Sequence, residues 1–177
     1  EDAPLRVASE STELIQDNVA YLKGDVNITQ GYRQARSDTA TVDQINRTVD
    51  LEGDIELREP GILLRGDAAY MNMDSLDVEI NNATYLLHES GARGTAQNLQ
   101  RPGGDIFYID DGGYTTCEPG NNAWRLVTSK LEVNPGTGIA TGKHVRLEVK
   151  DIPVWYVPWV RFAIDDRRTS GLLFPSW

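Results

Sequence analysis

The sequence repeats itself with a period of about 29 residues. Segment 22–28 (Leu-Lys-Gly-Asp-Val-Asn-Ile) resembles segment 51–57 (Leu-Glu-Gly-Asp-Ile-Glu-Leu), and segment 36–40 resembles 65–69 at the same offset. A third copy, Arg-Gly-Thr-Ala from residue 93, follows one residue sooner. Two separate blocks in the same register indicate a true repeat. Each unit has an apolar face that it buries only by stacking on its neighbours.

Within each unit, apolar and polar residues alternate. Residues 49–57 read Val-Asp-Leu-Glu-Gly-Asp-Ile-Glu-Leu, a period of two that predicts half-buried antiparallel strands. The Gly-Asp pairs at 24–25 and 53–54 suit a bend or bulge, and the alternation switches face at Gly66-Asp67. Segment 9–23 can be read alone as a capped helix. Because its end aligns with the repeat, we predict a strand there instead.

After about residue 100 the pattern changes. Segments 125–133 and 138–149 predict two further strands, and a loop surrounds Cys117. The last stretch, 152–177, is aromatic and apolar and holds three of the four tryptophans. Its final residues look cut in mid-structure, so we expect more chain beyond Trp177.

The composition excludes several functions. A net charge of −10 gives no basic footprint for nucleic acid and disfavours adhesion to an anionic membrane. No window approaches about 18 consecutive apolar residues, the length of a membrane helix. One cysteine and two histidines cannot build a Cys-based or His-rich metal site, and no cofactor motif is present. We therefore predict no catalytic residues, no metal and no cofactor.

The charged residues recur in register with the repeat. Arg36, Arg65 and Arg93 form a column that is either an exterior ladder or a set of cations for the phosphates of a ligand. We favour a ladder paired with Asp38 and Asp67, which follow two residues on along the strand. We interpret His88 and His144 as surface or cross-strand residues.

Cys117 and the apolar interior each have a plain and a functional interpretation. A lone cysteine is usually buried as a small hydrophobe, but this one lies in a polar loop. In an oxidising compartment it suggests a disulfide with a residue outside this sequence. The apolar faces form either an ordinary core or a groove for a long apolar ligand.

Three segments carry a family resemblance: 114–120 (Tyr-Thr-Thr-Cys-Glu-Pro-Gly), 153–159 (Pro-Val-Trp-Tyr-Val-Pro-Trp) and 166–175 (Asp-Arg-Arg-Thr-Ser-Gly-Leu-Leu-Phe-Pro). Together with the repeats, they resemble the N-terminal OstA-type β-jellyroll of the LptD family of lipopolysaccharide-assembly proteins. The resemblance covers nearly the whole chain. It implies an all-β jellyroll of folded-over antiparallel strands over 1–150. A linker and the start of an outer-membrane β-barrel would follow over 151–177, with the first barrel strand from about Tyr156.

The resemblance also implies a function without bond chemistry. Lipopolysaccharide would pass from the periplasm to the outer membrane, with its acyl chains inside the jellyroll and its sugars outside. A periplasmic bridge protein of the LptA type would pair with the N-terminal edge strand, and a plug lipoprotein of the LptE type would sit in the barrel. Cys117 would form a disulfide with that barrel. Family members often carry a second N-terminal cysteine, which this sequence lacks.

Our leading hypothesis is a lipid conduit whose lining comes from the inward parity of the strands. The predicted lining residues are Val26, Ile28, Val42, Leu51, Ile55, Leu57, Ile62, Leu64, Met71, Val78 and Tyr85. The alternatives are a β-solenoid enzyme acting on polysaccharide, which would need a carboxylate pair on an outer face, and a structural or adhesive repeat module.

Overall fold

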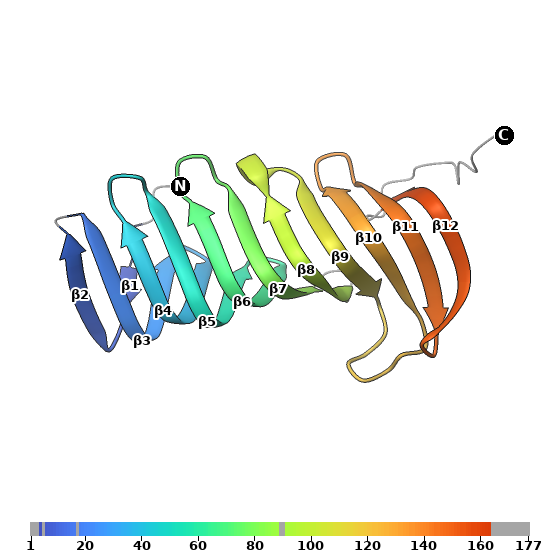
Figure 1. Cartoon of the computed structure of the whole chain (residues 1–177), viewed down its shortest axis with the longest axis horizontal. Coiled ribbons are helices and arrows are strands. Elements are labelled where there is room, and N and C mark those ends of the chain that lie inside the picture. The colour runs from blue at the N-terminus through green and yellow to red at the C-terminus, as the bar shows by residue number, and fades with distance from the viewer. Residues whose placement is uncertain (1–3, 5, 17, 89–90, 164–177) are drawn as a thin grey trace.

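The computed structural model describes residues 4, 6–16, 18–88 and 91–163. Over these residues the chain forms twelve β-strands and one short 3-10 helix, with most strands side by side in a row (Figure 1). The elements are β1 (Arg6–Ala8), β2 (Ser11–Gln16), β3 (Val19–Gln30), β4 (Arg33–Asp43), β5 (Thr48–Glu59), β6 (Ile62–Asn72), β7 (Val78–Leu87), β8 (Arg93–Arg101), η1 (Pro102–Gly104), β9 (Phe107–Thr115), β10 (Arg125–Asn134), β11 (Ile139–Val149) and β12 (Ile152–Ala163).

All twelve described strands belong to one antiparallel sheet. From β3 to β12 each strand pairs with the next along the chain, while β1 and β2 share the outer edge of β3. The prediction of strand rather than helix over 9–23 is confirmed by β2 and β3, and the predicted strands at 125–133 and 138–149 are β10 and β11. No helix in the described part of the chain is long and apolar enough to cross a membrane.

The sheet bends along a line through the middle of its odd-numbered strands. The predicted Gly-Asp bulges are confirmed, because both residues of each pair have positive φ and the register shifts there. The same left-handed conformation recurs at Asn82 in β7, Asp111 in β9 and His144 in β11, without the glycine. Residues at bulges bend the strand, so a column of them folds the whole sheet over.

The bend divides each long strand into two halves, which we call the first and second arms. The first arm contains residues 19–23, 39–43, 48–52, 68–72 and 78–81. The second arm contains residues 26–30, 33–37, 55–59, 62–66 and 83–87. Glu59, at the tip of the second arm, lies 3.8 Å from Arg101, which pairs with Val78 at the tip of the first. The tips therefore meet across an open seam.

The apolar core lies inside this fold, nearest the bend. Val26, Ile55, Ile80 and Leu99 are at most 2% exposed and form its centre. Alanines at 40, 69, 83 and 96 let the two arms approach closely there. The parity switch predicted at Gly66 is confirmed, since Leu64 and Ala69 are both buried although they are an odd number of residues apart.

The predicted pairing of the arginine column is wrong. Arg65 Nε donates a hydrogen bond to Glu56 Oε2 at 3.1 Å on the neighbouring strand, while Asp67 accepts one from Asn82. Directly opposite residues in a sheet lie closer together than residues two apart on one strand, so the cross-strand carboxylate takes the arginine. Arg93 instead donates to the carbonyl oxygens of residues 117 and 118.

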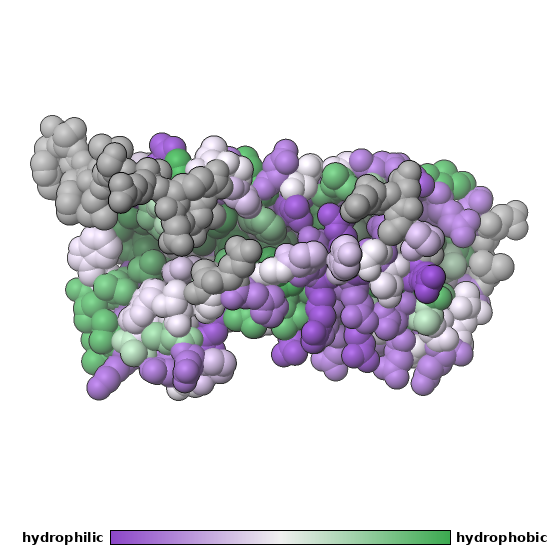
Figure 2. Space-filling model, turned by 180° about the vertical axis from the view of Figure 1, so that it is seen from behind, coloured by the Kyte–Doolittle hydropathy of each residue, from purple (hydrophilic) through white to green (hydrophobic). Residues whose placement is uncertain are grey.

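The C-terminal end of the described sheet is β12, which pairs with β11 along its length and contains Tyr156. Tyr156 accepts or donates a 2.7 Å hydrogen bond with His144, which confirms that this histidine is a cross-strand residue. Hydrophobic side chains of β12 are exposed, and this end lies at the left in Figure 2. The predicted domain boundary at 150 stays a prediction, and most of the predicted barrel start, 164–177, lies outside the described residues.

Candidate functional site

A cavity of about 430 Å³ opens between the tips of the two arms. Its walls come from β1 and from the inward faces of β3 to β9, so the alternation of the sequence decides which side chains reach it. Apolar side chains dominate the walls, and charged ones gather where the tips meet. Seen from behind, hydrophobic surface lies in the depth of the molecule between hydrophilic outer residues (Figure 2).

Eight of the eleven predicted lining residues reach this cavity. The first arm contributes Val42, Leu51, Met71 and Val78, and the second arm contributes Ile28, Leu57, Ile62 and Leu64. Both walls are therefore apolar, and neither comes from a single repeat unit. The alternation of apolar and polar residues along each strand predicted these eight positions.

The other three predicted residues lie elsewhere. Val26 and Ile55 adjoin the bend, where the arms are packed together, and they belong to the closed core. Tyr85 lies along the second arm beyond the cavity, and its hydroxyl donates a 2.7 Å hydrogen bond to the Gly113 carbonyl. Burial raises the pKa of this phenol well above its ordinary value.

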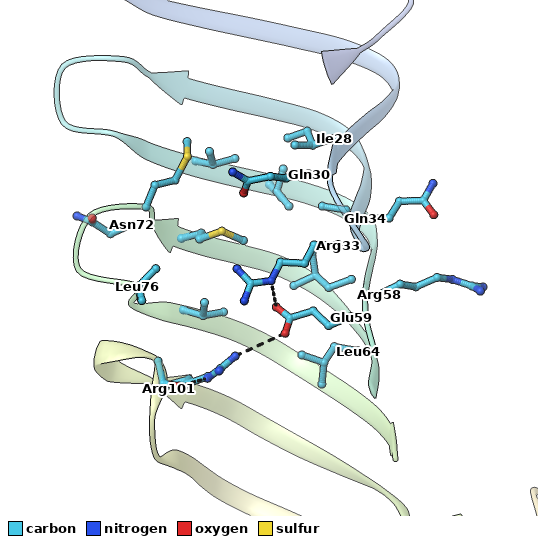
Figure 3. A pocket seen from close by; sticks show the side chains of 18 of the residues that line it. Ile28, Gln30, Arg33, Gln34, Arg58, Glu59, Leu64, Asn72, Leu76 and Arg101 are labelled. Carbon is cyan, nitrogen blue, oxygen red and sulfur yellow. Dashed lines mark hydrogen bonds and ion pairs between the residues drawn. The ribbon is translucent and has the colours of Figure 1, made fainter. Parts of the chain in front are cut away.

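The sequence prediction missed a charged cluster at the seam, which we call the seam clasp: Arg33, Glu59 and Arg101 (Figure 3). Arg33 Nε lies 3.7 Å from Glu59 Oε1, and Arg101 Nη1 lies 3.8 Å from Glu59 Oε2. The two arginines come from opposite arms. Neighbouring Arg58 points away from the cavity in the same view.

Arg101 is held in place on its own side of the seam. Its Nε donates a 2.8 Å hydrogen bond to the Gly104 carbonyl of η1, and its guanidinium lies 5.0 Å from the centre of the Phe107 ring. Both contacts fix the direction of the side chain, since a guanidinium stacks well on an aromatic face. Phe107 and Leu76 complete the apolar wall on this side and were also missed.

Cys117 lies half-buried in the loop between β9 and β10 as a free thiol. Hydrogen bonding with Thr115 lowers the pKa of the thiol from its ordinary value, with a smaller contribution from nearby Arg93. Arg93 ties the loop to β8 by its bonds to the carbonyls of residues 117 and 118. The disulfide predicted for Cys117 stays a prediction. Over the described residues, no group of three or more His, Cys, Asp or Glu side chains is placed to hold a metal ion.

Comparison with known proteins shows which family this chain resembles. Residues 6–139 match the family described as LptA/(LptD N-terminal domain) LPS transport protein. The LPS-assembly protein LptD of Pseudomonas syringae pv. syringae is 43% identical over 176 residues, and that of Pseudomonas fluorescens is 42% identical over 177. Each comparison covers 99% of this chain but 19% of the relative, so the chain spans about a fifth of their length.

A solved structure has a similar fold. It is LptH of Pseudomonas aeruginosa, described as the LptA homologous periplasmic component of the lipopolysaccharide transport device. The TM-score is 0.50 at 22% identity, over 57% of this chain and 77% of LptH. The folded-over antiparallel sheet is thus shared with a jellyroll of the LptA type, and the sequence match spans three quarters of the chain. The chain belongs to the LptA and LptD N-terminal domain family of LPS transport proteins.

Proposed function

We propose that this chain carries lipopolysaccharide by holding its acyl chains in the cavity between the two arms. The observation that carries the proposal is the apolar lining contributed by both arms, which stays open along the seam. Family membership supplies the lipid class. No bond is made or broken in this function.

The physical basis is desolvation. Each methylene of an acyl chain that leaves water contributes about 0.8 kcal/mol, so several carbons against Leu57, Ile62 and Met71 outweigh the cost of ordering the chain. A hydrocarbon needs no directional partner, which allows it to slide along the lining. The polar head would stay at the opening of the seam, where charged side chains gather.

Photo-crosslinking tests this proposal with two neighbouring residues of β6. Met71 lines the cavity, whereas the Tyr70 side chain is exposed on the opposite face. A benzophenone amino acid at Met71 should capture lipopolysaccharide in cells, and the same group at Tyr70 should not. Tyr70 is the matched control because an aromatic side chain already stands there. Equal capture at both positions would contradict the proposal.

We also propose that the N-terminal edge, formed by β1 and β2, pairs with a bridge protein of the LptA type. The exposed backbone of an edge strand is a template for adding a strand from another chain. Support comes from the topology, in which β1 and β2 pair only with β3 within the described residues.

Delivery to an outer-membrane barrel with a plug lipoprotein of the LptE type rests on family membership alone, since the relatives extend far beyond this chain. We propose it for the protein to which this sequence belongs. Co-purification of the full-length protein with that lipoprotein tests it, and isolation of the protein alone from membranes would contradict it.

A further inference from the structure

The seam clasp holds more positive than negative charge. Arg33 and Arg101 share the single carboxylate of Glu59, although the chain as a whole carries −10. The nitrogen–oxygen distances of 3.7 and 3.8 Å are longer than those of a hydrogen bond. The carboxylate thus balances the two guanidinium groups loosely and from a distance.

A second Arg–Glu–Arg group, on the outer face of the sheet, has hydrogen bonds between its arginines and its glutamate. Glu56 accepts hydrogen bonds from Arg58 Nε at 2.6 Å and Arg65 Nε at 3.1 Å. Each group consists of two arginines and one glutamate, and the two glutamates lie three residues apart on β5. The outer group is closed by hydrogen bonds, whereas the seam clasp leaves its arginines further from their carboxylate.

The location of the clasp points to a ligand with two chemical halves. The three side chains are partly exposed, with Arg33 at 60%, Glu59 at 35% and Arg101 at 26%, so solvent and solutes reach them. Directly behind them lies the apolar cavity, and Leu57 and Leu64 line its second-arm wall. An amphiphile with its chain in the cavity would place its head group at the clasp.

A phosphate suits a site with two arginines better than a singly charged head group does. A phosphate monoester carries about −1.5 to −2 charge at pH 7 and offers three acceptor oxygens. Guanidinium groups bind such oxygens in bidentate fashion. Arg101 is already oriented by Gly104 and Phe107, which reduces the entropy lost on binding.

We propose that Arg33 and Arg101 bind the phosphate head group of an amphiphile whose chain occupies the cavity, with Glu59 as the internal anion that the phosphate displaces. This inference rests on the proposed lipid-binding function and adds a head-group site to it. Glu59 keeps the seam neutralised when no ligand is present. It also competes with the ligand for the two arginines. Removing an arginine should therefore weaken binding, whereas removing the charge of Glu59 should strengthen it.

Calorimetric titration with dodecyl phosphate and dodecyl maltoside, both below their micellar concentrations, tests the proposal. Arg33→Gln should weaken binding of the phosphate about fivefold and leave the maltoside unchanged. Arg101→Gln should do the same, and Glu59→Gln should strengthen phosphate binding. The matched controls are Glu56→Gln and Arg65→Gln in the outer group, which should alter neither affinity.

The outcomes separate the two proposals. If both probes bind and their affinities do not depend on Arg33 or Glu59, the head-group site is overturned and the proposal that the cavity holds acyl chains is unaffected. Failure of both probes to bind would contradict the cavity and this inference together. Inorganic phosphate is the third probe. If it binds as tightly as dodecyl phosphate, the clasp is a site for free anions and the proposal is overturned.

Discussion

At the scale of single residues, the close packing at Gly94 gives a sharp test of the fold. The Tyr85 ring lies against Gly94 and its hydroxyl bonds to the Gly113 carbonyl, so a Cβ at Gly94 would overlap both. Gly94→Ala should lower the free energy of unfolding by about 1–3 kcal/mol. Urea titration measures this change in the free energy of unfolding.

Gly113→Ala is the matched control on the neighbouring strand. An added Cβ there meets no atom closer than 3.6 Å, so the change should be neutral or stabilise the protein by about 0.4–1 kcal/mol. Equal destabilisation by both substitutions would show that Tyr85 does not pack as described.

At the scale of elements, the repeat extends into the hairpin turns. Asp43 accepts hydrogen bonds from the backbone N–H groups of Ile45 and Asn46, and Asn72, one repeat later, accepts them from Asp74 and Ser75. The bonds from Asn46 lower the pKa of the Asp43 carboxyl below 3.8. A side chain of this type at the first turn position is a recurring way to close a hairpin.

The lowered pKa of Asp43 predicts a dependence of stability on acid. A group with a depressed folded pKa stabilises the protein above its unfolded value and loses that contribution as the pH falls through the folded value. The free energy of unfolding should therefore drop below pH 3.8 less steeply in Asp43→Asn than in the wild type. Asparagine keeps the turn, as Asn72 does. Identical slopes in urea titrations across this range would contradict the assignment.

Individual residues explain how far the sequence predicts these elements. Val42 and Met71 were found because alternation decides the face of a side chain once the strand is known. Ile55 has the right face, but only the position of the bend decides whether an inward residue meets the opposite arm or the cavity. The clasp was missed because Glu59 and Arg101 lie far apart in sequence and meet only when the sheet folds over.

At the scale of the whole molecule, the sheet has two ends with different surfaces. The N-terminal end offers the backbone edge of β1 and β2, while the C-terminal end offers the exposed aromatic side chains of β12. An end with free backbone groups favours strand addition, and exposed apolar side chains favour burial against another surface. The two ends are therefore suited to different partners.

The proposed edge pairing is tested by two exposed threonines. Thr12 lies on the edge strand β2, and Thr84 lies on β7 in the middle of the sheet. A photo-crosslinker at Thr12 should capture the LptA-type protein in cells, whereas one at Thr84 should not, because both edges of β7 are already paired. Capture at Thr84 but not at Thr12 would place the partner on the face of the sheet instead.

The left-handed residues in every second strand define the unit by which such a molecule grows. Because only odd-numbered strands carry them, a duplication must add a hairpin of two strands to keep the line of the bend straight. Neighbouring strands lie about 4.8 Å apart, so each added unit lengthens the sheet by roughly 10 Å with both walls in place. The period in the sequence therefore sets a length: the number of repeats decides how far the folded sheet extends, and its cross-section stays the same.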